Sequence, residues 1–211
     1  TARHEEFPDY KAHREEIPED LAKSIPYVFR LCECFNIPLL TKQGYEADDI
    51  IGTLAVKAEK EGFDTFMMTP DKDFGQLVDE HTFIYKPARA GSGAEVMGMA
   101  EVCKRWDIER VEQVKDILGL MGDASDNIPG IPGVGEKTAI QLVKQFGSIE
   151  NLLENTDQLK GKLKEKVELN KEMAIQSKRL ATILLDVPVN TNLDDLKSVE
   201  PDKEKLRELF T

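Results

Sequence analysis

The sequence predicts an α/β protein, with a parallel sheet in its first half and a helical subdomain in its second half. Short apolar runs alternate with amphipathic helical patterns up to about residue 95, and this order is typical of parallel strands joined by helices. Every strong pattern after that point has helical spacing. The 211 residues are 40% hydrophobic, which is enough to build a core, and the length allows one ample domain or a main domain with a small appendage.

Local patterns define the elements of the first half. Apolar residues recur at helical spacing from Leu21 to Phe35, and Pro26 is expected to kink this helix. The residues before Ile17 have little apolar content, so we expect them to form an exposed segment. The expected elements are helices at 18–36, 46–61 and 72–78, strands at 37–40, 64–69 and 82–85, and a loop at 88–94.

The second half is predicted to be helical to its end. The expected helices are at about 98–107, 111–121, 137–146, 148–155, 160–184 and 202–210. We therefore predict two domains, an α/β core at 1–95 and a helical subdomain at 96–211. Lys160 to Thr182 holds seven basic and three acidic residues, so positive charge is concentrated in this subdomain.

The overall charge limits the classes of function. Lys plus Arg is 28 and Asp plus Glu is 40, and the net charge of −12 excludes a protein that binds nucleic acid through bulk positive charge. Apolar stretches such as Ile117 to Met121 are far shorter than the roughly 18 residues of a membrane span, and the first residues form no apolar signal core. Three cysteines form neither a disulfide framework nor a zinc pattern. We expect a cytoplasmic protein that makes no membrane contact.

Acidic residues gather in three short loops where a sheet of this class places its ligands. They are Glu46, Asp48 and Asp49 at the start of a helix, Asp71 and Asp73 after a strand, and Asp123 and Asp126 in a turn between two helices. Hard cations such as Mg²⁺ need only one or two direct carboxylates each, so this set could hold two ions about 3.5–4 Å apart.

Each of these acids also has a structural explanation. An acid in the first turn of a helix complements its dipole, and aspartate is common at N-caps and turns. Caps are expected as single residues, however, whereas these acids are crowded together. Like charges that close need a cation or protons. The combination therefore favours a metal site.

Residues 128–139 combine prolines and glycines directly before a helix. Gly133 and Gly135 flank Val134 and allow close backbone approach, and Lys137 and Thr138 stand beside the turn. Free N–H groups at the start of the helix would bind a phosphate, as in a helix-hairpin-helix that grips nucleic acid without reading bases. A Rossmann turn is disfavoured because no strand precedes this segment. A turn with no ligand remains an alternative.

These segments together resemble a known family. The matching segments are RHEEFPDYKAHR at 3–14, GYEADD at 44–49, TPDKDFGQL at 69–77 and GDASDNIPGIPGVGEKTA at 122–139. The chain resembles the 5′-nuclease (flap endonuclease) superfamily, and most closely the 5′-3′ exonuclease domains of bacterial DNA polymerase I. The resemblance implies a PIN-like nuclease core and cleavage of 5′-flaps, nicked or branched duplexes and RNA primer–DNA hybrids in replication and repair.

The resemblance also assigns residues. It implies two Mg²⁺ or Mn²⁺ ions held by Glu46, Asp48, Asp49, Asp71, Asp73, Asp123 and Asp126. It implies catalytic roles for Lys11 and Arg14 at the scissile phosphate. DNA contacts are expected from Arg3, Tyr10, Lys72, Gly133, Val134, Gly135, Lys137 and Thr138, with a monovalent cation possible at the hairpin.

The sequence departs from the family pattern at its ends. Family members begin with a strand that carries an aspartate, and another aspartate shortly precedes the first matching segment, so both are expected before Thr1. We expect these 211 residues alone to bind branched DNA and to cut it poorly, and we expect fusion to polymerase domains. Two rival functions stay open: a non-catalytic module that binds branched DNA, and a ribonuclease with a similar acid cluster.

Overall fold

A mixed sheet of three strands lies in the first half of the computed structural model, which describes residues 1–88 and 93–211. Strand β1 (Thr65–Met68) pairs in parallel with β2 (Thr82–Lys86), and β3 (Glu95–Met97) pairs antiparallel with β2. The expected all-parallel sheet is therefore wrong for β3. Too few residues separate β2 from β3 for the crossover that a parallel neighbour requires. Part of the loop expected at 88–94 lies outside the described residues.

The strand expected at 37–40 does not form. These residues pair with no described strand, and Ile37 and Leu39 are 53% and 45% exposed. A short apolar segment forms a strand only where a neighbouring strand makes hydrogen bonds with its backbone. No strand of the described residues pairs with 37–40.

Four helical elements complete the first half. They are α1 (Ala2–Glu6), α2 (Glu19–Cys34), α3 (Ala47–Lys60) and the 3₁₀ helix η1 (Lys72–Leu77). Pro26 lies inside α2. The segment before Ile17 was expected to be exposed, and this expectation is wrong for two of its residues. Arg3 and Tyr10 are 8% and 2% exposed and pack against the core. Long-range polar contacts of these two side chains, which composition does not reveal, hold the segment in place.

The second half is helical, as expected. Its α-helices are α4 (Met99–Trp106), α5 (Val114–Met121), α6 (Glu136–Phe146), α7 (Ile149–Glu154), α8 (Gly161–Leu169), α9 (Lys171–Ala181) and α10 (Lys203–Phe210). Short 3₁₀ helices are η2 (Val111–Gln113), η3 (Thr156–Gln158) and η4 (Leu193–Leu196). The helix expected at 160–184 is two helices, because Asn170 leaves helical geometry with φ of −121°.

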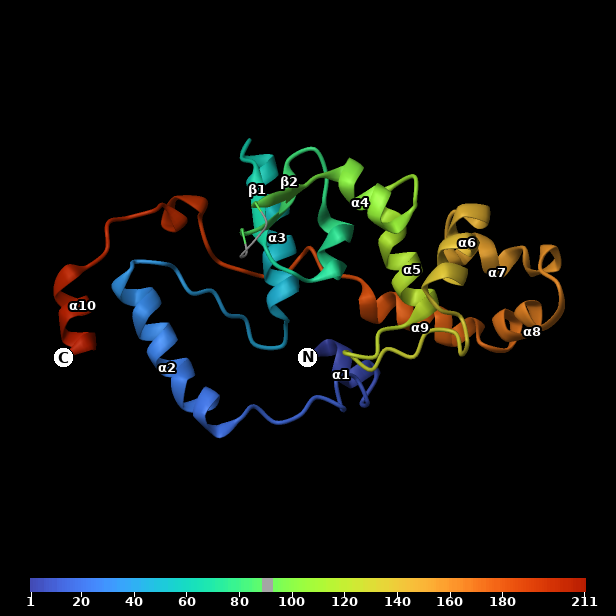
Figure 1. The fold of residues 1–211 in the computed structure, drawn as a ribbon, viewed down its shortest axis with the longest axis horizontal. Coiled ribbons are helices and arrows are strands. Elements are labelled where there is room, and N and C mark those ends of the chain that lie inside the picture. Colours follow the sequence, from blue (N-terminus) through green and yellow to red (C-terminus); the bar gives the residue numbers. More distant parts are fainter. Residues whose placement is uncertain (89–92) are drawn as a thin grey trace.

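Helix α5 is the centre of the core. Val114, Ile117, Leu118 and Leu120 have no exposed surface, and α6 and α9 pack beside them (Figure 1). The loop of Asp123 and Asp126 follows α5 directly, and η1, which follows Asp71, packs against α5. Strand β3 continues the sheet past residue 95, the expected domain boundary.

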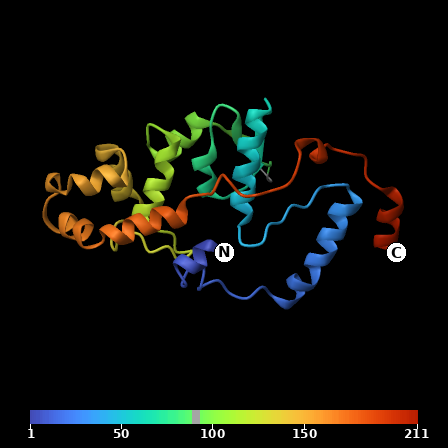
Figure 2. The ribbon, with the colours of Figure 1, turned by 180° about the vertical axis from the view of Figure 1, so that it is seen from behind.

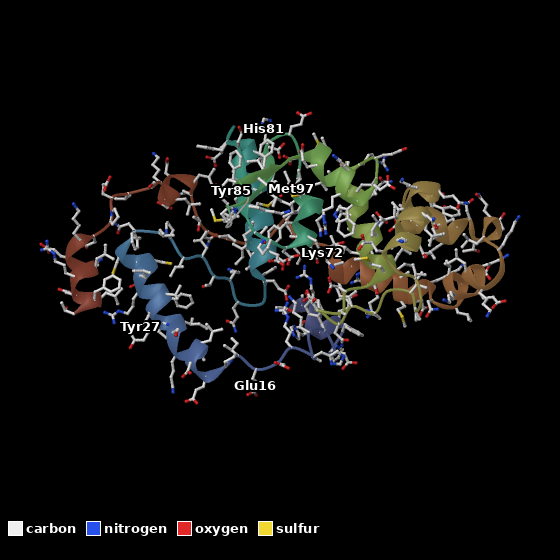
Figure 3. The ribbon with its side chains drawn as sticks, in the orientation of Figure 1. Glu16, Tyr27, Lys72, His81, Tyr85 and Met97 are labelled. Atoms are coloured by element: carbon white, nitrogen blue, oxygen red, sulfur yellow. The ribbon has the colours of Figure 1, made fainter. Side chains whose placement is uncertain are left out.

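Helices α2 and α10 lie beside each other, apart from the rest of the molecule, in both Figure 1 and Figure 2. The amide of Asp202 donates to Cys34 O at 2.8 Å, and Asn36 Nδ2 donates to Glu200 O at 2.6 Å. Figure 3 shows Tyr27 on α2 far from the sheet that carries Tyr85. None of the described helices has the length and apolar character needed to cross a membrane.

Candidate metal and nucleic-acid site

Each acidic loop is shaped by hydrogen bonds from its own acids. The amide of Glu46 donates to Asp49 Oδ2 at 3.1 Å at the start of α3. Asp71 Oδ1 accepts from the amide of Asp73 at 2.9 Å at the start of η1. In the turn after α5, Asp123 Oδ1 accepts from the amide of Ser125 at 2.8 Å. The capping roles weighed in the sequence are therefore present, and each loop still has other carboxylate oxygens.

An open cleft brings two of the acidic loops together. It has a volume of about 420 Å³. Its charged lining consists of Asp71, Asp73, Asp123 and Asp126 with Arg14, Lys72 and Arg105. Arg105 was not singled out in the sequence, because basic residues in the last turn of a helix, here Lys104 and Arg105, are common and give no signal of a site.

The charge of Asp73 is only partly compensated, by the ammonium of Lys72. Burial, and then the charge of Asp71, raise the pKa of Asp73 to about 7. Its Oδ1 atom is buried and has no hydrogen-bond partner among the described residues. Burial and Asp71 also raise the pKa of Asp48. A buried carboxylate oxygen without a partner, beside two further acids, fits a divalent cation.

The first and third acidic loops meet through residues of the N-terminal segment. Lys11 Nζ lies 2.7 Å from Glu46 Oε2 and 3.4 Å from Asp126 Oδ2, and Tyr10 Oη is within hydrogen-bond distance of both carboxylates. Arg14 Nη2 pairs with Asp126 Oδ1 at 2.7 Å. Lys11 has a left-handed backbone, with φ of 58°, and its amide donates to Asp126 O. The sequence-predicted basic residues are therefore held at the acidic site.

Lys72 compensates the remaining acid of the cleft. Its Nζ lies 2.7 Å from Asp123 Oδ2, and Figure 3 places it between the sheet and α1. Burial alone would raise the pKa of Asp123, but the ammonium of Lys72 holds it below its ordinary value.

Asp49 is enclosed by hydrogen bonds. It has no exposed surface, and the Arg3 guanidinium donates to both of its oxygens at 2.8 and 2.7 Å. The amide of Leu184 also donates to Oδ1. Although burial acts to raise it, these bonds hold the pKa of Asp49 below its ordinary value. Arg3 and Asp49 thus form a buried pair, in which Arg3 keeps 8% of its surface exposed and Asp49 keeps none.

Metal-ligand geometry has not formed around these acids. No group of three or more His, Cys, Asp or Glu side chains is arranged to hold an ion in residues 1–88 and 93–211. The ammonium and guanidinium groups of Lys11, Arg14 and Lys72 lie among the carboxylates instead. To bind a metal ion, Glu46, Asp123 and Asp126 would have to break their ion pairs with these basic side chains.

The glycine turn lies between α5 and α6, as the sequence predicts. Gly133 has φ of 76°, in the left-handed region that favours glycine, and Gly135 is the N-cap of α6. Val134 is 3% exposed, so its side chain anchors the turn in the core. Lys137 is exposed, and Thr138 is half-buried. Lys166 Nζ on α8 reaches Gly133 O at 3.4 Å, so the turn has a cation beside it that the sequence analysis did not assign.

Two family models cover nearly the whole chain. Residues 1–107 match "5′-3′ exonuclease, N-terminal resolvase-like domain", and residues 109–204 match "5′-3′ exonuclease, C-terminal SAM fold".

A curated relative and solved structures agree with the family models. The chain is 43% identical to DNA polymerase I of Bacillus caldotenax over 211 residues, which are all of this chain and 24% of that protein. The chain thus spans about a quarter of the length of that relative. A zinc-bound 5′-exonuclease of bacteriophage T5 aligns with a TM-score of 0.73 at 22% identity, over 99% of this chain and 77% of that one. A T5 flap endonuclease in complex with DNA and metal ions aligns with a TM-score of 0.68 at 24% identity. The alignment covers 85% of this chain and 68% of that one. These TM-scores show a shared fold.

Proposed function

Because the chain belongs to the 5′-3′ exonuclease family, we propose that its three acidic loops form the active site of a divalent-metal-dependent 5′-3′ exonuclease and flap endonuclease. The observation that carries the proposal is the cleft where Asp71 and Asp73 face Asp123 and Asp126, with a buried oxygen of Asp73 lacking any described partner. The substrates are 5′-flaps, nicked or branched duplexes and RNA primer–DNA hybrids, in an enzyme that also carries polymerase domains.

We propose that Asp48, Asp71 and Asp73 hold one Mg²⁺ or Mn²⁺ ion, and that Asp123 and Asp126, with Glu46 nearby, serve the second. When bound, such ions activate the attacking water and stabilise the leaving oxygen. The raised pKa values of Asp48 and Asp73 support this assignment, because a cation relieves the repulsion that raises them. Asp49 was expected among the ligands. Its enclosure by Arg3 supports a positioning role at the start of α3 instead.

Basic side chains at the cleft would bind and orient the scissile phosphate. Lys11 and Arg14 stand beside Asp126, and Arg105 shares the cleft lining. Positive groups aimed at the phosphate stabilise charge that develops during attack. Arg3 and Tyr10 were expected to contact DNA. Their burial supports a role in shaping this site, in which Tyr10 supports Glu46 and Arg3 holds Asp49.

The hairpin would hold the duplex beside the cleft. The loop between α5 and α6 carries both Asp126 and the backbone amides of Gly133 and Gly135. Phosphate contacts of this kind position a duplex without reading its sequence. We propose the same loop for the monovalent cation, through its carbonyl groups.

A cleavage assay on a 5′-flap duplex distinguishes the nuclease from a non-catalytic module that only binds branched DNA. We expect these 211 residues to release the flap slowly, in a reaction that depends on added Mg²⁺ or Mn²⁺ and stops with a chelator. Binding of the flap with no cleavage at any metal concentration would support the non-catalytic alternative.

Replacing Lys72 with methionine is expected to change metal binding and cleavage in opposite directions. Removing the ammonium from Asp123 should tighten Mn²⁺ binding by about 2–5-fold, since the cation competes for that carboxylate. Cleavage should slow at least about tenfold, because a positive group is lost from the phosphate site. Calorimetry with Mn²⁺ and single-turnover cleavage measure the two effects. Lys86→Met, which removes a lysine paired with Glu95 on the sheet, is the control. Weaker Mn²⁺ binding in Lys72→Met would contradict the competition.

Replacing Gly135 with asparagine is expected to weaken duplex binding about tenfold and leave thermal stability unchanged. Gly135 has φ of −93°, no described atom lies within 4 Å of an added Cβ, and asparagine is a good N-cap. The new side chain would obstruct approach of a phosphate to the hairpin amides. Fluorescence anisotropy at several salt concentrations, with Ca²⁺ replacing Mg²⁺, measures the affinity. Equal affinity of the variant and the parent would show that the turn binds no ligand.

A further inference from the structure

Residues Leu180–Leu184, at and after the end of α9, are held through their backbone by side chains of the first half. Three side chains, from α1, α3 and η1, make the bonds. Arg3 donates to Leu180 O and Thr182 O at 3.0 and 2.8 Å, Gln76 Nε2 donates to Ala181 O at 3.0 Å, Gln76 Oε1 accepts from the Ile183 amide at 3.0 Å, and Asp49 Oδ1 accepts from the Leu184 amide at 2.9 Å. The helical subdomain is thus fixed to the core at the acidic site.

Gln76 connects this segment to a proposed metal ligand. Its Nε2 also donates to Asp73 O at 3.0 Å. The side-chain amide of Gln76 therefore donates to two carbonyl groups, those of Asp73 and Ala181, and accepts from the backbone amide of Ile183. Only one orientation of the amide satisfies all three partners. Gln76 is half-buried and so has little freedom to adopt another rotamer.

An earlier turn of α9 contacts the glycine-rich loop. Ser177 has no exposed surface, and its Oγ accepts from the amide of Gly130 at 3.0 Å. Ser177 lies about one helical turn before Ala181, the residue that Gln76 holds. A rigid helix thus bonds to the loop that continues into the hairpin and, through Gln76, to the loop of Asp73.

We propose that Gln76 is a positioning residue that fixes Asp73 against α9, so that the affinity of the site for a divalent cation depends on this one amide. The inference deepens the proposed function and rests on it. A ligand held within a fraction of an ångström binds an ion more tightly than one that must be ordered first, and outer-shell partners of ligands change metal affinity by about 10–100-fold.

The test replaces Gln76 with methionine, which keeps the length and removes all three hydrogen bonds. We expect Mn²⁺ affinity, measured by calorimetry without DNA, to fall about 10–100-fold. The Mg²⁺ concentration for half-maximal cleavage should rise by a similar factor, while the rate at saturating Mg²⁺ stays within about threefold of the parent. The matched control is Gln176→Met on α9, since Gln176 is a half-buried glutamine whose side chain makes no hydrogen bond to the described residues.

A purely structural role would give a different result. If Gln76→Met lowered only the melting temperature and left Mn²⁺ affinity unchanged, the proposal would be wrong. Gln76→Asn is a second variant that keeps an amide too short to reach both sides, and the same loss of affinity is expected from it. A parent protein that binds Mn²⁺ but does not cut DNA would contradict the proposed function while leaving the positioning role measurable by calorimetry.

Discussion

Replacing Asp73 with asparagine is expected to lower flap cleavage by at least about 100-fold and to stabilise the metal-free protein. The carboxylate has a buried oxygen without a described partner, so its negative charge is costly until a cation binds it. The amide carries no charge and binds Mg²⁺ less strongly, so activity and metal-free stability should change in opposite directions. Single-turnover cleavage and thermal unfolding in a chelator measure the two effects.

The stability effect of Asp73 has a defined pH dependence. The pKa of Asp73 is about 7 in the folded protein and 3.8 for the ordinary group. Between these values the folded state binds more protons than the unfolded state, so this group reduces stability progressively as pH rises from about 4 to about 7. Without metal, the parent should therefore lose more stability than Asp73→Asn between pH 5 and pH 8. Saturating Mg²⁺ should reduce that difference.

The control for Asp73→Asn is Asp157→Asn, because Asp157 is an exposed acid in η3 at a distance from the cleft. It should change neither cleavage nor the pH dependence of unfolding. If Asp73→Asn cut the flap at the parental rate, Asp73 would not be a metal ligand.

Replacing Arg3 with alanine is expected to lower the free energy of unfolding by about 3–5 kcal/mol, the cost of leaving a buried charge without its partner. Asp49 has no exposed surface and receives two hydrogen bonds from the guanidinium. The variant also loses the bonds to Leu180 O and Thr182 O, so the end of α9 should loosen from the core. For a chain of 211 residues the melting temperature should fall by about 10 °C.

A double-variant cycle isolates the pair. Asp49→Asn alone should also destabilise, and adding it to Arg3→Ala should cost less than the sum of the two single effects. Arg179→Ala is the matched control, because Arg179 is exposed and pairs with Glu6 at the surface. Additive effects of Arg3→Ala and Asp49→Asn would show that the two side chains do not act as a pair.

The sequence was sufficient where local pattern determines structure. Helical spacing located α3 and the helices from α4 to α7, and the glycine turn before α6 was expected from Gly133 and Gly135. The acidic loops at Asp71 and Asp123 were expected to lie near each other because strand ends and helix turns place them at one edge. The cleft that both line agrees with that expectation.

Long-range partners account for what the sequence did not predict. The segment at 37–40 has no neighbouring strand to pair with in the described part of the chain, and the short antiparallel strand β3 was not predicted, because it is only three residues long and depends on its pairing with β2. Arg3 and Tyr10 lie in a charged segment whose composition predicts exposure. Their contacts with Asp49 and Glu46 explain why they are buried. Gln76 gave no signal either, since its three partners are backbone groups distributed over 111 residues of sequence, from Asp73 to Ile183.

The central claim is that the acidic loops bind divalent cations for phosphodiester cleavage. A crystal of the protein grown with Mn²⁺ and measured at the manganese absorption edge tests it most directly. The account predicts an anomalous peak at a bonding distance of roughly 2.1 Å from an oxygen of Asp73, with the Lys72 ammonium moved away from Asp123. A map with no peak beside Asp73, and with Lys72 still paired to Asp123 at saturating Mn²⁺, would contradict it.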